Sequence, residues 1–288
     1  MQAKCLTITY LTKASYASLN GGDKEADNIS SIKKIQMSDG KEYPYKSSQA
    51  IRRDLREQLA VLGEELSETE TAKQDKGAAT TQGKPQQFID DDLFGFMQAD
   101  KVTIKRTSPV RVSPLIALEP YRGELDFATN YMGVKAGGNP NIFESEIHSG
   151  FYRGTILVEL DRVGIADASN YELNLSNNEK KRRVSVLLDA IQTLWGVGRQ
   201  SRFLADISPK FICGALLTVK NPIFLECLTT NDSLVNMPLI ESTVNDFKNV
   251  VKDWVLGERK GFFEKDLEQA LPMGEAFVKM KKWLDEVY

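Results

Sequence analysis

Histidine and cysteine are scarce in this chain of 288 residues: His148 is the only histidine, and the three cysteines lie far apart. A Ser-His-Asp or Cys-His catalytic set would need that one histidine, and no second histidine is present for a metal-binding pair. No two cysteines have the Cys-x-x-Cys spacing of zinc sites. We therefore expect no metal, no cofactor and a reduced, cytoplasmic protein, with His148 in a loop or in the core.

Long hydrophobic runs are also missing. The longest apolar-rich stretch, 211–228, is interrupted by two charged residues, an asparagine and a proline, so it does not predict a membrane span. The first ten residues lack the apolar segment of a signal peptide. The glycines of 196–202 match neither a Walker A loop nor a dinucleotide-binding fingerprint. We expect a soluble protein with no membrane partner and no nucleotide cofactor.

An excess of basic charge is missing as well, because 37 lysines and arginines face 40 aspartates and glutamates and the formal net charge is -3. This balance argues against nucleic-acid binding through bulk charge, but a local basic stripe can still neutralise phosphates. The bases are concentrated at 46–56, 101–111 and 180–202, while acids outnumber bases across 63–92. The near-neutral total therefore conceals an uneven distribution of charge.

The composition is otherwise that of a globular protein, with 41% hydrophobic and 27% charged residues. Apolar spacing predicts strands at 4–12, 151–163 and 209–219, and helices at 47–62, 180–195 and from Glu241 onward. The tryptophans at 195, 254 and 283 fall at helical periods and are interpreted as core residues. The order strand, helix, strand, helix, strand favours an α+β fold of the ferredoxin-like or RNA-recognition-motif type.

Three polar segments interrupt this order. Residues 15–46 predict a long loop with a small hairpin around Asp39-Gly40, residues 63–87 predict a mobile insertion, and residues 120–150 predict a long hairpin or arm. Compact domains rarely keep loops of this length without a use. The insertions are therefore expected to take part in function.

The segment KSSQAIRRDLR at 46–56 is the sharpest local feature of the chain. A helix that begins at Ser47 or Ser48 presents free N–H groups and a positive partial charge to phosphate. Arginines at 52, 53 and 56 add planar, bidentate phosphate contacts. A capped helix with a solvated basic face fits the same residues.

The loop GVGRQSR at 196–202 is the second feature, because a glycine turn lets the backbone approach a phosphate closely and Arg199 and Arg202 supply charge. An ordinary helix C-terminus followed by a loop is the alternative.

Asp90, Asp91 and Asp92 are carboxylates of the kind that magnesium prefers, but consecutive side chains point in different directions. A solvated turn that leads into Leu93 is the simpler interpretation.

The run from Asn20 to Arg56 resembles the N-terminal signature of the crRNA-lining backbone subunits of type I-B CRISPR (Cascade) complexes, the DevR-type autoregulator branch of the RAMP superfamily. The resemblance depends on an asparagine, a lysine, a Ser-Ser-Gln helix start and the basic residues that follow, which are here Asn20, Lys33 or Lys34, Ser47-Ser48-Gln49, Arg52-Arg53 and Arg56. Residues 149–160 and 198–212 resemble the family's central palm strand and its glycine-arginine loop.

The resemblance implies a single RNA-recognition-type domain over 1–288 with finger and thumb insertions. The expected parts are finger or loop insertions at 13–47 and 63–100, a thumb at 107–150, and a C-terminal helical part at 241–288.

The resemblance also implies a non-catalytic subunit whose copies stack head to tail along crRNA and support pairing of the guide with target DNA. The other expected partners are the large and small subunits, the crRNA 5'-end-capping subunit and the crRNA-processing endonuclease. The residues expected to bind RNA are Asn20, Lys46, Ser47, Ser48, Gln49, Arg52, Arg53, Arg56, Lys105, Arg106, Arg111, Arg199, Gln200 and Arg202.

Two alternatives stay open at this level. Related type III backbone subunits cleave target RNA with a loop aspartate, so a metal-dependent ribonuclease that uses an aspartate near 90–92 is the main alternative. A DNA-binding autoregulator is the other, although no helix-turn-helix pattern with a basic recognition helix is visible.

Overall fold

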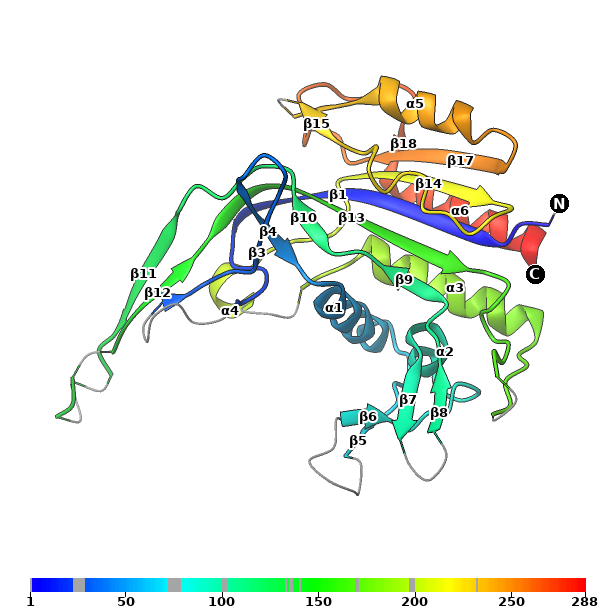
Figure 1. The fold of residues 1–288 in the computed structure, drawn as a ribbon, viewed down its shortest axis with the longest axis horizontal. Helices are drawn as coiled ribbons and strands as arrows, with labels where there is room; N and C mark the ends of the chain where they lie inside the picture. Colours follow the sequence, from blue (N-terminus) through cyan, green and yellow to red (C-terminus); the bar gives the residue numbers. More distant parts are fainter. Residues whose placement is uncertain are drawn as a thin grey trace.

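The structure is a computed structural model. It describes residues 2–22, 29–71, 79–99, 103–132, 134, 137–139, 141–168, 171–196, 200–231 and 233–288. Within these residues the fold is α+β, with one nine-stranded sheet, four small strand groups or pairs, and six helices (Figure 1). None of the described helices is long and apolar enough to span a membrane.

Three long antiparallel strands form the centre of the large sheet. β1 (Cys5–Ala17) lies between β13 (His148–Glu159) and β14 (Phe211–Leu217), with Ile8 opposite both Ile156 and Gly214. The sheet continues beyond β14 through β17 (Val251–Glu258) and β18 (Leu271–Pro272), and beyond β13 through β10 (Leu115–Ala117), β4 (Glu42–Lys46) and β3 (Lys34–Gln36). β9 (Val110–Val112) also pairs with β13 but lies off this path.

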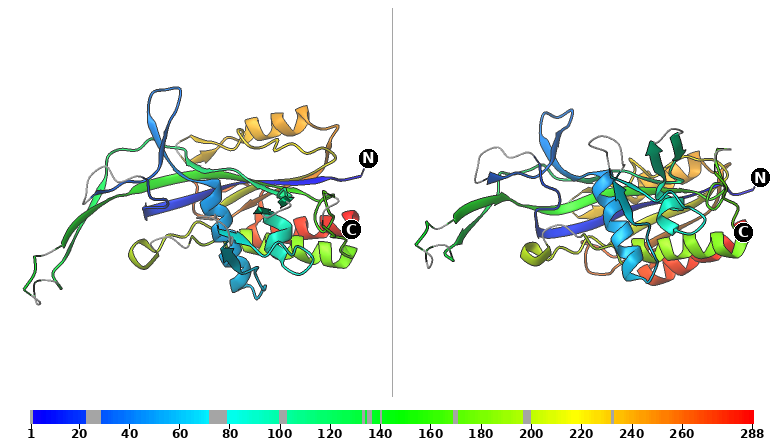
Figure 2. Two further views of the ribbon diagram at one scale, coloured as in Figure 1. Left: turned by 60° about the horizontal axis from the view of Figure 1, so that its bottom comes forward. Right: turned by 90° about the horizontal axis from the view of Figure 1, so that it is seen from below.

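Alternate side chains of β1 build two cores on opposite faces of the sheet. Leu6, Ile8 and Tyr10 pack beneath the helices α1 (Ser48–Val61), α3 (Asn177–Gln192) and α6 (Met273–Val287). Cys5 and Leu11 face the segment that contains α5 (Met237–Asp246). Figure 2 shows α5 on one side of the sheet and the other three helices on the opposite side.

The insertions carry small strands of their own. β11 (Leu125–Asn130) and β12 (Asn141–Glu146) form a hairpin that extends away from the large sheet, and β2 (Ile29–Ser30) pairs with its base (Figure 1). The remaining elements are β5 (Thr69–Thr71), β6 (Ala79–Thr81), α2 (Ile89–Phe94), β7 (Phe96–Ala99), β8 (Thr103–Arg106), α4 (Gln200–Phe203), β15 (Thr230–Asn231) and β16 (Leu234–Val235).

Most of the predicted secondary structure is confirmed. The three expected strands are β1, β13 and β14, and the first two expected helices are α1 and α3. Asp39 and Gly40 lie in the turn between β3 and β4, and the long hairpin expected in 120–150 is the β11–β12 pair. In the polar insertion expected to be mobile, β5 pairs with β6, and residues 72–78 lie outside the described residues.

The continuous helical pattern expected from Glu241 onward is wrong in its middle. After α5 the chain forms β17, which pairs with β14 from Phe211↔Glu258 to Leu217↔Val251, and only α6 restores the helix. Strand β1 is also longer than expected. It continues to Ala17 because β13 supplies a pairing partner as far as His148.

Candidate nucleic-acid interface

The start of α1 brings together three parts of the chain that are distant in sequence. Ser47 is the N-cap, and its Oγ accepts a hydrogen bond from the Ala50 N–H at 3.3 Å. The Ser47 N–H donates to Asn20 Oδ1 at 2.9 Å, and the Lys33 N–H donates to the Asn20 carbonyl at 2.9 Å. The asparagine, lysine and serine of the sequence signature therefore meet at one helix N-terminus, where backbone N–H groups and the helix dipole favour an anion.

The polar side chains of this helix start differ in exposure. Gln49 is exposed, whereas Ser47 and Ser48 are half-buried, and the Ser48 hydroxyl lies 3.2 Å from Gln49 Oε1. Arg53 has 74% of its side chain exposed, and its guanidinium lies 3.7 Å from the carboxylate of Glu57. Gln49 and Arg53 are one turn apart and lie on the same outward face of α1.

The other two arginines of α1 face neighbouring elements. Arg52 donates to the Val110 carbonyl at 3.3 Å, and burial, followed by the positive charge of Arg111, lowers its pKa. Arg56 pairs with Asp90 at 2.6 Å and is half-buried. Arg52 and Arg111 therefore form a second local concentration of positive charge at the β9 edge of the sheet.

The structure corrects the predicted RNA contacts of Lys46 and Arg106, because both residues are only 3% exposed. Lys46 Nζ lies 2.6 Å from Asp54 Oδ2 beneath α1. The Arg106 guanidinium lies 2.5 Å from Asp92 Oδ1 and also donates to the carbonyls of Arg162 and Ile165. These cations stabilise the fold and are not accessible to a phosphate.

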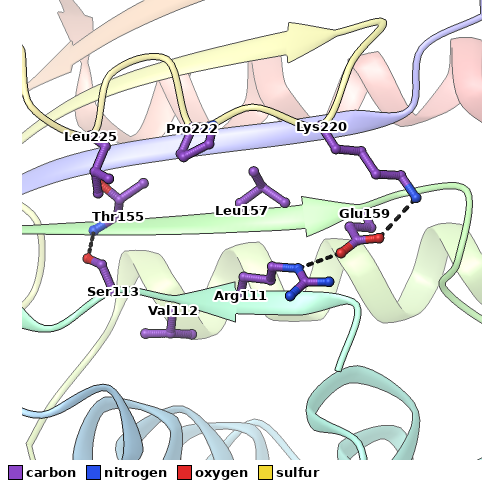
Figure 3. Close-up of a pocket in the computed structure, with 9 residues that line it drawn as sticks. All are labelled: Arg111, Val112, Ser113, Thr155, Leu157, Glu159, Lys220, Pro222 and Leu225. Carbon is purple, nitrogen blue, oxygen red and sulfur yellow. Dashed lines mark hydrogen bonds and ion pairs between the residues drawn. The ribbon is translucent and has the colours of Figure 1, made fainter. Parts of the chain in front are cut away.

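Arg111 lies at the rim of a pocket of about 430 Å³ between β9, β13 and the segment after β14 (Figure 3). Leu157 and Pro222 supply apolar walls, and Glu159 lies between Arg111 at 2.6 Å and Lys220 at 2.9 Å. Burial raises the pKa of Glu159, but hydrogen bonds from Lys220, Arg111 and Arg162 outweigh burial and hold the pKa below its usual value. Arg111 is still 56% exposed in its side chain, so it can reach a phosphate while it retains this ion pair.

The second basic segment lies only partly in the described chain. Arg199 lies outside the described residues, and the side chain of Gln200 is not described, although its backbone begins α4. Arg202 pairs with Asp126, donates to Ser145 Oγ at 3.0 Å and lies 4.8 Å from the ring centroid of Phe143. It therefore fixes α4 to the base of the β11–β12 hairpin. Lys105 is exposed on β8.

The three consecutive aspartates are buried in α2, so the expected solvated turn is wrong. Asp92 accepts hydrogen bonds from Arg106, from Arg183 at 2.9 Å and from the Gly164 N–H at 3.1 Å. Asp91 Oδ2 accepts from the Lys84 N–H at 2.8 Å, and Asp90 pairs with Arg56. Among the described residues no group of three or more His, Cys, Asp or Glu side chains is placed to hold a metal ion.

The prediction for His148 is confirmed, whereas the prediction for the tryptophans is only partly correct. His148 is 5% exposed, and its Nδ1 lies 2.8 Å from the Tyr152 hydroxyl, which confirms a core histidine. Burial lowers its pKa. Trp283 is buried, but Trp195 has 49% of its surface exposed, so the interpretation of Trp195 as a core residue is wrong.

Comparison with known proteins shows the family to which the chain belongs. The family model described as "CRISPR-associated negative auto-regulator DevR/Csa2" matches residues 8–234. A "CRISPR-associated protein Cas7/Cst2/DevR" of Myxococcus xanthus (strain DK1622) is 26% identical over 224 residues, which cover 70% of this chain and 68% of the relative.

Solved structures show the same fold at lower identity. A chain of a "CRISPR RNA-guided surveillance complex, pre-nicking" superposes with a TM-score of 0.67 at 15% identity, over 99% of this chain and 100% of that chain. A chain of a "CRISPR RNA-guided surveillance complex" gives 0.62 at 17% identity, over 97% and 99%. Because the family model covers most of the chain, this protein belongs to the CRISPR-associated DevR/Csa2 family.

Proposed function

We propose that this protein is a non-catalytic, crRNA-binding backbone subunit of a type I CRISPR surveillance complex. One observation carries the proposal: Asn20, Ser47 and the exposed Gln49 and Arg53 lie together at the N-terminus of α1. This arrangement offers hydrogen-bond donors and positive charge to a phosphate. Its family membership and its likeness to chains of RNA-guided complexes support the same role.

We interpret the centre of the large sheet as an RNA-recognition-type palm. The strand order β14-β1-β13, followed by β9 and β10, together with α1 after β1 and α3 after β13, is the βαββαβ order of ferredoxin-like folds. In this interpretation the β11–β12 hairpin is the thumb, and the β5–β8 region is part of a finger.

The RNA track in this proposal begins at the start of α1 and continues toward the β9 edge. Its members are Asn20, Ser47, Ser48, Gln49, Arg52, Arg53, Arg56 and Arg111, with Lys105, Arg199, Gln200 and Arg202 as further contributors. The contacts are to phosphate and sugar, so the guide's bases stay available to pair with target DNA. Further copies would bind head to tail on the same RNA, and the large, small, 5'-end-capping and processing subunits would complete the complex.

Replacing Arg53 with alanine tests the track. Arg53→Ala removes one exposed charge, so RNA affinity should fall, and the slope of log K against log salt should become shallower by about 0.7 for single-stranded RNA. Lys282→Ala is the matched control, because Lys282 is exposed on α6, on a different helix. Salt titrations of RNA binding by fluorescence anisotropy would measure both variants.

If Arg53→Ala and Lys282→Ala bind with the same affinity and slope as the wild type, the helix start is not part of the RNA site. The ribonuclease alternative has its own test, in which the RNA-bound protein is incubated with complementary RNA and magnesium. Regularly spaced cuts that disappear in Asp91→Asn would replace the proposed role with a catalytic one.

A further inference from the structure

A second pocket of about 430 Å³ lies where the loop after α3 meets the start of β14 and the end of β17. The residues that line it combine aromatic, aliphatic and charged side chains and are Thr193, Leu194, Trp195, Leu204, Asp206, Ser208 and Arg259. Trp195 is 49% exposed and Leu204 is 76% exposed. The described part of the chain therefore presents two large apolar side chains to solvent around one concavity.

Packing does not account for these two side chains. A tryptophan gains stability by burying its ring, yet Trp195 leaves half of its surface in water. Leu204 also has a left-handed backbone, with φ +46°, which is unfavourable for a branched side chain. Strained backbone residues cluster at functional sites, and grouped exposed apolar side chains mark binding surfaces.

The charges of the pocket favour an anionic group beside the ring. Asp206 is held by Lys210 at 2.5 Å and lies 3.7 Å from Arg259, so two cations face one carboxylate. Burial raises the pKa of Asp206, but hydrogen bonds from Lys210 and Ser208 outweigh burial and lower the pKa below its usual value. Since the charge of Asp206 balances that of Lys210, the net positive charge of these three residues lies on Arg259, whose side chain is 37% exposed.

The pocket is close to the proposed RNA track. Thr193 Oγ1 accepts a hydrogen bond from Gln58 Nε2 at 2.9 Å, which joins the pocket's edge to α1. Gln58 lies about 16 Å along the helix from the Ser47 cap, at 1.5 Å per residue. We take both places to lie within reach of one single strand.

We propose that this pocket binds one unpaired nucleobase of the RNA, stacked on the Trp195 indole, with Arg259 at the adjoining phosphate. The inference depends on the proposed RNA-binding function and adds a base-stacking subsite to it. Because every base has a π-face, the subsite binds RNA without sequence preference. It fixes the position of one base, while the phosphate contacts of α1 fix the backbone.

Loss of a stacked base should lower RNA affinity without changing its salt dependence, whereas loss of a charge contact changes both. Trp195→Ala should weaken binding of a single-stranded RNA oligomer about tenfold, as expected for the loss of one base stack, without changing the salt slope. Trp195→Phe should retain most of the affinity, because a phenyl ring also stacks. An oligomer of the same length without bases should bind the wild type and Trp195→Ala equally.

Tryptophan fluorescence gives an independent readout on the intact protein. RNA should quench the wild-type emission, and the quenching should disappear in Trp195→Phe but persist in the control Trp254→Phe. The subsite is wrong if Trp195→Ala binds RNA as tightly as the wild type and RNA does not change the wild-type tryptophan emission. If RNA binding still depends on Arg53 in that case, the proposed function stands.

Two other outcomes also overturn the subsite. If the wild type binds no RNA, the proposed function and the subsite fail together. If the Trp195 emission shifts with protein concentration in the absence of RNA, the pocket is a contact between copies of the chain and not a base-binding site.

Discussion

At the scale of single residues, the charges of this protein divide into buried pairs and exposed cations. Asp92 belongs to the first group, since it is fully buried and accepts from two arginine guanidiniums and a backbone N–H. Buried ion pairs gain little over apolar packing, but removing one partner leaves an uncompensated charge. Asp92 therefore holds α2 and α3 together mainly by keeping Arg106 and Arg183 neutralised.

Asp92→Asn should lower the free energy of unfolding by about 3–5 kcal/mol, because it removes the buried carboxylate that Arg106 and Arg183 share, while Arg183 keeps its pair with Glu179 at 2.9 Å. Urea or guanidinium unfolding followed by circular dichroism measures the change. Asp285→Asn is the control, since Asp285 pairs with Lys181 at the exposed surface, and its cost should be about 0.5 kcal/mol or less. Equal midpoints for the two variants would contradict a stabilising role for the buried network.

Buried ion pairs also explain which residues of the candidate site could be predicted from the sequence. The helix start and exposed Arg53 follow from local spacing, which fixes both the N-cap and the helix face. The burial of Lys46 and Arg106 does not follow from local spacing, because nothing in that spacing indicates that they form buried ion pairs with Asp54 and Asp92. Local charge counts treat every base as available, whereas long-range pairing decides which of them reach solvent.

At the scale of elements, β17 is a strand although its apolar spacing alone predicts a helix. Its residues continue the apolar spacing of α5, so periodicity alone predicts more helix. The strand forms because β14 supplies an open edge and α6 covers its face. Gly257 permits this contact, since a Cβ there would lie 2.6 Å from the Ala276 Cβ and 2.9 Å from Ile212 Cγ1.

Gly257→Ala should destabilise the protein by about 1–3 kcal/mol, because the added methyl overpacks the interface between β17 and α6. Gly274→Ala, on α6, is a matched control. Gly274 lies in the first turn of α6, and a Cβ there would approach nothing closer than Gln192 Nε2, at 3.9 Å. The alanine there should stabilise by about 0.5–1 kcal/mol. Thermal unfolding of the two variants should shift in opposite directions, and a parallel shift would contradict this account of β17.

At the scale of the whole molecule, the β11–β12 hairpin projects from the sheet with apolar side chains exposed. Leu125, Phe127 and Ile142 are between 46% and 60% exposed. Cross-strand pairing of Phe127 with Glu144 and of Thr129 with Ile142 places these three residues on one face of the hairpin. Arg202 covers part of the other face through Phe143 and Asp126. An apolar face on an extended arm favours a contact with another molecule.

If copies assemble on RNA through this arm, replacing residues 127–144 with an Asn-Gly turn should change unfolding little. The arm packs little against the large sheet, and the losses are confined to the contacts of Phe143 with Arg202 and of Glu144 with β2. A single copy should still bind a short RNA, since the start of α1 is intact.

On longer RNA the number of bound wild-type copies should rise in proportion to RNA length, while fewer copies of the shortened variant should bind, and without cooperativity. Sedimentation velocity on RNAs of one and two unit lengths measures the number of copies. Equal stoichiometry for both proteins would contradict a role of the hairpin in assembly, whereas a loss only on the longer RNA would assign the arm to contacts between copies, separate from the phosphate contacts of α1.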